Sequence, residues 1–96
     1  MKSKRVAVSA RVSSDRPEAV RPVLDGLFPG SPVRKEGDEL VFEAEVEGTD
    51  VKELNRSVLS ALRRAEKKTR LRSEWKTEDG TTYRFFDYVL KKTIVG

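Results

Sequence analysis

The sequence contains no cysteine and no histidine. Because cysteine is absent, a disulfide framework and a thiolate zinc site are excluded, and a cytoplasmic location is expected. Because histidine is absent, the usual general base, the commonest metal ligand and every nucleophile that depends on an imidazole are excluded as well. We therefore expect no enzyme activity, no catalytic residue, no cofactor and no metal.

Long apolar runs are also missing. No segment approaches the roughly 20 apolar residues that a membrane-spanning helix needs, and the N-terminal stretch MKSKRVAVSARV lacks the apolar centre of a signal peptide. Hydrophobic residues make up 36% and charged residues 38% of the 96 positions. These values predict a single folded domain over residues 1–96 that does not contact a membrane.

Charge is distributed unevenly, although the formal net charge is only +4. Residues 36–50 carry seven acidic side chains and no basic one. Residues 52–76 carry nine basic side chains against three acidic ones. This segregation predicts two differently charged surfaces, of which the positive one is a candidate for binding phosphate.

Apolar periodicity predicts the elements of the first half. Apolar side chains alternate in residues 5–12, which is typical of a strand with one solvated face. Asp15 and Glu18 resemble a capping box for a helix. Pro22 within it lacks a backbone donor, so we expect a kink or a short, irregular helix. A hairpin follows around Gly37-Asp38, and its second strand alternates cleanly. The outward residues of that strand form a row of glutamates: Glu39, Glu43, Glu45 and Glu47.

A second helix begins after Asp50, which forms a capping box with Glu53. A row of basic residues lies at its C-terminal end, where the helix dipole favours positive charge. A hairpin over residues 70–88 follows, with a two-residue turn at Asp79-Gly80. The order β-α-β-β-α-β-β predicts an α+β domain with two helices on one face of an antiparallel sheet.

The turn at Asp79-Gly80, taken literally, pairs Glu78 with Thr81 and places Arg84 opposite Trp75, in cation–π contact. One face of the hairpin then carries apolar residues: Leu71, Trp75, Phe86 and Tyr88. The other face carries charged residues and two further aromatics: Arg72, Glu74, Lys76, Tyr83, Phe85 and Asp87. Residues 1–4 are expected to form a basic arm, and residues 89–96 a tail that extends the last strand or contacts another subunit.

Basic and aromatic side chains after the second helix form the candidate nucleic-acid interface. Basic side chains neutralise phosphates, and aromatic rings stack on unpaired nucleobases. The predicted set is Arg63, Arg64, Lys67, Lys68, Arg70, Arg72, Lys76, Tyr83, Arg84 and Phe85. A solvated strand face with cross-strand aromatic pairs explains the same residues without a ligand. A separate margin of the second helix is the candidate partner-binding surface: Val58, Leu59 and Leu62.

The stretch LVFEAEVEGTDVKELNRSVLSALRR carries a resemblance to a known family. Residues 5–65 resemble the small dimerisation subunit, or a paralogue of it, of the archaeal and eukaryotic KEOPS (EKC) complex, which supports threonylcarbamoyladenosine modification of tRNA. The family pattern D-x-x-x-L-x-x-x-L-x-S-x-L-R falls on Asp50, Leu54, Val58, Ser60, Leu62 and Arg63. Leu59 stands where the family usually has asparagine, and residues 66–96 extend beyond the family's usual end.

This resemblance implies a non-catalytic protein that dimerises through its sheet, offers its helices to a larger catalytic subunit and helps to hold tRNA. Together with the basic residues, it predicts an RNA-associated accessory subunit, a homodimer or heterodimer, that binds tRNA. Two alternatives stay open. One is a protein–protein interaction module whose charge serves only solubility, and the other is a small archaeal RNA-binding protein of a different α+β family.

Overall fold

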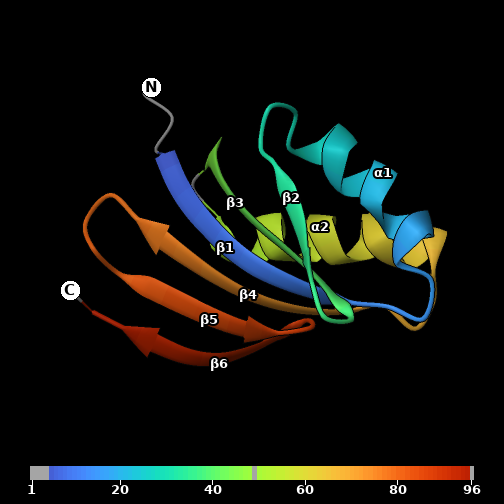
Figure 1. Cartoon of the computed structure of the whole chain (residues 1–96). Helices are drawn as coiled ribbons and strands as arrows, with labels where there is room; N and C mark the ends of the chain where they lie inside the picture. Colours follow the sequence, from blue (N-terminus) through green and yellow to red (C-terminus); the bar gives the residue numbers. More distant parts are fainter. Residues whose placement is uncertain (1–4, 49, 96) are drawn as a thin grey trace.

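The computed structural model describes residues 5–48 and 50–95. Within these ranges six strands form one antiparallel sheet in the order β2-β3-β1-β4-β5-β6, and both helices lie on one of its faces (Figure 1). The predicted basic arm, residues 1–4, lies outside the described residues. The elements are β1 (Arg5–Ser13), α1 (Pro17–Leu27), β2 (Val33–Glu36), β3 (Glu39–Glu47), α2 (Val51–Ala65), β4 (Arg70–Thr77), β5 (Thr82–Phe86) and β6 (Val89–Ile94).

The predicted α+β class and the order of the elements up to β5 are confirmed, and the chain adds one further strand. After β5 the backbone turns at Asp87, a non-glycine residue with a φ of 55°. Segment Val89–Ile94 then pairs antiparallel with β5 and forms the outer edge of the sheet. The prediction that this segment extends the preceding strand is therefore wrong, because the turn folds it back as a separate strand.

The alternation predicted for β1 and β3 is confirmed. Val6, Val8, Ala10 and Val12 of β1 are all buried on the helix-covered face. The β3 glutamates alternate onto the other face, which no helix covers (Figure 1). Since β1 pairs with β3 on one side and with β4 on the other, the most apolar strand lies in the middle of the sheet.

The two helices begin differently. Asp50 caps α2 as predicted, because its side chain accepts a hydrogen bond of 3.2 Å from the backbone N–H of Glu53. The predicted capping box of α1 is wrong: the N-cap is Arg16, which makes no side-chain cap bond. Pro17 in the first turn fixes φ for helix entry and needs no such cap. Pro22 lies within the continuous helix α1.

The predicted two-residue turn of the β4–β5 hairpin is also wrong. The N–H of Thr77 donates to the carbonyl of Thr81 (2.9 Å), which closes a three-residue loop with Gly80 at a φ of 89°. This is the loop type in which glycine takes the left-handed position. The observed register pairs Trp75 with Tyr83 instead of Arg84, so the predicted contact of Arg84 with Trp75 is absent. A shift of one residue exchanges the two faces of β5.

A buried polar group joins α2 to the sheet. Asn55 is 1% exposed, and its Oδ1 accepts hydrogen bonds from the hydroxyl of Ser73 and from Nε1 of Trp75, the latter at 3.2 Å. Its Nδ2 donates to the carbonyl oxygen of Asp87 at 2.8 Å. One side chain thus connects the helix, strand β4 and the turn between β5 and β6.

Candidate nucleic-acid interface

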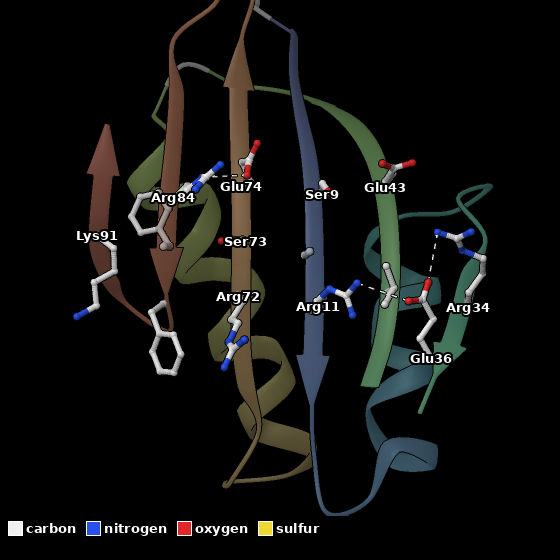
Figure 2. A pocket seen from close by; sticks show the side chains of 14 residues that line it. Ser9, Arg11, Arg34, Glu36, Glu43, Arg72, Ser73, Glu74, Arg84 and Lys91 are labelled. Atoms are coloured by element: carbon white, nitrogen blue, oxygen red, sulfur yellow. Dashed lines mark hydrogen bonds and ion pairs between the residues drawn. The ribbon is translucent and has the colours of Figure 1, made fainter. Parts of the chain in front are cut away.

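The face of the sheet that the helices leave open is divided by charge. Strand β3 presents its glutamates on this face, and strands β4 to β6 present mostly arginine and lysine. Figure 2 shows Glu43 of β3 on one side and Arg72, Arg84 and Lys91 on the other. Strand β1 lies between the two halves and supplies the arginines that pair with the acids. Arg5 lies 3.4 Å from Glu45, and Arg11 lies 3.4 Å from Glu39.

Strand β1 therefore separates the glutamate row of β3 from the basic half of the face. Arg11 also lies 3.5 Å from Glu36, so the central arginine is shared by two carboxylates on its acidic side (Figure 2). On the basic half, Arg84 pairs with Glu74 of the neighbouring strand at 3.1 Å. That pair is exposed, so its Coulomb energy is strongly reduced by water.

A second group of bases lies where α2 ends and β4 begins. We call it the helix-end cluster: Arg63, Lys67, Lys68 and Arg70. These side chains line a hollow of about 450 Å³ together with Ser13, Ser14 and Asp15. The local turn is fixed by Thr69, whose buried hydroxyl donates to the carbonyl of Glu66 at 2.7 Å. The sequence KKTR thereby places its bases around the end of β1.

Arg63 has a structural role within this cluster. Its Nε donates to the carbonyl of Thr69 at 3.0 Å, and its terminal nitrogen lies 3.6 Å from Oδ2 of Asp87. The guanidinium carbon also lies 5.2 Å from the ring centroid of Tyr88. Arg63 therefore holds the β5–β6 turn against the helix, and phosphate would have to compete with these contacts.

Arg70 connects the helix-end cluster to the open sheet face. It lines the hollow, and its guanidinium carbon also lies 5.9 Å from the ring centroid of Phe86 on β5. Arg72, two residues further along β4, lies 5.4 Å from the same centroid. In the described part of the chain, Lys67, Lys68, Arg70 and Arg72 form no ion pair with a carboxylate, which leaves their charges available to a ligand.

Of the remaining predicted bases, only part joins this surface. Arg84 lies on the open face beside Arg72 but is paired with Glu74 (Figure 2). Lys76 lies toward the other end of β4, opposite Ala7 of β1. Arg64 is exposed on α2 and does not line the hollow. The predicted set therefore divides into a connected group and two isolated bases.

The two predicted stacking residues belong to the inner face. Phe85 is 5% exposed within the core, and Tyr83 packs partly buried against the same core. Their assignment to a ligand surface is wrong because the three-residue loop shifts the register by one residue. Phe86 takes the outer position instead, opposite Arg72.

The predicted partner-binding residues are wrong as well. Val58 is 7% exposed, and Leu59 and Leu62 are fully buried in the core of the same chain. The buried face of α2 is centred on Asn55, Leu59 and Leu62. The sequence did not indicate this face, because a polar residue such as asparagine is not expected in the core. Exposed large hydrophobic residues in the described ranges gather instead after β5: Tyr88, Val89, Ile94 and Val95, with Leu27 elsewhere.

Sequence reasoning missed three contributors: the ring of Phe86, the ammonium of Lys91 on β6, and the hydroxyls of Ser13 and Ser14 beside the hollow. If Glu78-Asp79-Gly80 had been taken as a three-residue hairpin loop, the resulting register would have placed Phe86 on the open face of the sheet. Lys91 lies at an irregularity in the β5–β6 pairing, which residue spacing does not reveal.

Comparisons with known proteins returned no match. No family model, no curated protein and no solved structure matches the chain. Across the described residues, neither helix has the length and apolar character required to cross a membrane. Over the same ranges no three acidic side chains gather closely enough to hold a metal ion.

Proposed function

We propose that this chain is a non-catalytic, RNA-associated protein that binds RNA phosphates through the helix-end cluster and the adjoining bases of β4. The observation that carries the proposal is the position of Arg70, which lies both in the hollow and beside Phe86 on the sheet face. It makes one connected positive surface from segments that are distant in sequence. Lys and Arg that neutralise phosphates release counterions, which provides the main sequence-independent affinity for nucleic acids.

The resemblance of residues 5–65 to the KEOPS subunit supports a narrower version of this proposal. The RNA is then tRNA, and the chain is an accessory subunit of a cytoplasmic tRNA-modification complex that includes a larger catalytic subunit. A fold with an open sheet face is compatible with this role. The proposal for tRNA rests on the resemblance, whereas the proposal for phosphate binding rests on the bases themselves.

We also propose that the chain assembles with a partner, as a homodimer or a heterodimer. The support is the group of exposed aliphatic residues on the outer edge of the sheet: Val89 is 54% exposed, Ile94 38% and Val95 80%. Strand β6 pairs with β5 on one side, and its other side is the edge of the sheet. Unpaired edges and exposed aliphatic residues favour contact with another chain.

The same edge favours a second candidate function, a protein–protein interaction module without affinity for RNA. Light scattering after size exclusion, combined with a tRNA shift assay at about 50 mM salt, separates the two functions. A defined oligomer that shifts no tRNA at this low salt concentration would support the interaction module and contradict RNA binding.

The decisive experiment for RNA binding is a charge reversal at the helix-end cluster. In the variant Lys67→Glu/Lys68→Glu we expect at least about a tenfold loss of tRNA affinity. The slope of log K against log salt should become shallower by about 1.4 to 1.8, since two phosphate contacts are lost. The matched control is Lys35→Glu/Lys52→Glu, which changes the net charge equally at exposed sites on β2 and α2. Equal losses in both variants would contradict a local binding surface.

A further inference from the structure

The open sheet face carries one aromatic ring whose position the core does not explain. Phe86 is partly exposed and is not part of the core cluster, unlike its neighbour Phe85. It lies opposite Arg72 on β4 and close to Arg70, with centroid distances of 5.4 and 5.9 Å to the two guanidinium carbons. Cations near an aromatic ring hold its position and provide charge next to its face.

A groove of about 510 Å³ extends beside this ring across the middle of the sheet. On the β4–β6 side it is lined by Arg72, Arg84 and Lys91 together with Glu74, and on the β2–β3 side by Glu43, Glu36 and Arg34. Ser9 and Arg11 of β1 lie between them (Figure 2). The volume falls in the range of clefts that hold small ligands. The β4–β6 side carries three cations against one carboxylate and matches phosphate, and the carboxylate of Glu43 can accept hydrogen bonds from the amino groups of bases.

These observations together point to a specific form of RNA. We infer that the groove binds an unpaired RNA segment, with one base stacked on Phe86, its phosphates toward Arg72 and Lys91, and base edges toward Glu43. A base inside a duplex is already stacked on its neighbours and cannot offer its face to a ring. The inference rests on the proposed RNA binding and names the class of RNA that this surface selects.

The test compares an unstructured oligocytidine of about ten nucleotides, whose bases carry an amino group, with a duplex of the same charge. We expect the wild-type protein to prefer the single strand. Phe86→Leu, which keeps an apolar side chain but removes the ring, should bind the single strand about 5- to 150-fold more weakly. Phe86→Trp should keep the affinity. Its new indole should be quenched on binding, whereas the only native tryptophan, Trp75, is buried and provides a constant background.

The outcomes separate this inference from the proposed function. Equal affinity of Phe86→Leu and wild type for the single strand, while Lys67→Glu/Lys68→Glu still loses affinity, would overturn the inference and leave RNA binding in place. A shift of Phe86→Leu from dimer to monomer with unchanged RNA affinity would overturn it too, because the face would then bind a second copy. Absence of all RNA binding would overturn both.

Discussion

Replacing Asn55 by leucine should destabilise the fold strongly, although leucine is similar in size and apolar. Asn55 accepts from Ser73 and Trp75 and donates to the carbonyl of Asp87. Each of these three bonds contributes about 0.5–1.5 kcal/mol net, so the variant should lose roughly 2–4 kcal/mol of unfolding free energy. For a domain of this size, that corresponds to a fall in Tm of about 10–25 °C.

Urea unfolding followed by far-UV circular dichroism and by the emission of Trp75 measures this loss. Ser73→Ala removes the bond to Asn55 and the bond of 3.0 Å that the hydroxyl accepts from Nε1 of Trp75, which keeps Asn55 as an acceptor; it should cost less, about 1–2 kcal/mol. Ser57→Ala, on the exposed side of the same helix, is the matched control and should stay within about 0.5 kcal/mol of wild type. If Asn55→Leu also stays within that range, the polar connection between α2, β4 and the β5–β6 turn contributes nothing, and the reasoning is refuted.

Two pairs of further variants test local backbone structure and helix capping. Gly80→Ala should destabilise the hairpin by about 1–2 kcal/mol, since alanine is strained at a φ of 89°. Gly26→Ala in α1, where an added Cβ meets nothing within 4 Å, should stabilise the fold by about 0.5–1 kcal/mol. Thermal unfolding should show a lower Tm for Gly80→Ala and a higher Tm for Gly26→Ala. A lower Tm for Gly26→Ala would contradict this prediction. Asp50→Ala should cost about 1 kcal/mol because it removes the cap of α2. Asp15→Ala should change nothing measurable, and an equal loss in both variants would show that Asp15 caps α1 after all.

The sequence predicted correctly those elements whose residue pattern is consistent with only one structure. Strict alternation in β1 and β3 and the cap at Asp50 led to the observed strands and to the start of α2. It did not predict the faces of β5, because Phe85 and Phe86 are both aromatic and alternation cannot choose between them. Which of the two rings points outward depends on the length of the loop after Thr77. Gly80 fits both a two-residue and a three-residue loop, so the sequence does not determine this length.

The candidate site was predicted in part for a related reason. Charge alone identified the bases of the helix-end cluster, because a dense basic run is visible without any coordinates. The strand order determines which of these basic residues pair with carboxylates. Because β1 lies between β3 and β4, the β3 glutamates are separated from the basic residues of β4. The buried face of α2 was misjudged because Asn55 is polar and buried, and its partners lie on strand β4 and in the β5–β6 turn, which are distant in sequence.

The central claim is that the basic residues at the end of α2 and on β4 to β6 form one surface that binds RNA phosphates, separate from the glutamate row. The most direct test is an NMR titration of the isotope-labelled protein with unstructured RNA. We predict that the amide signals of residues 67–72 and 84–91 shift together at the same RNA concentration, with that of Glu43 across the groove, while those of residues 36–41 and 45–47 stay in place. Shifts centred on residues 36–47, or confined to α1, would contradict it.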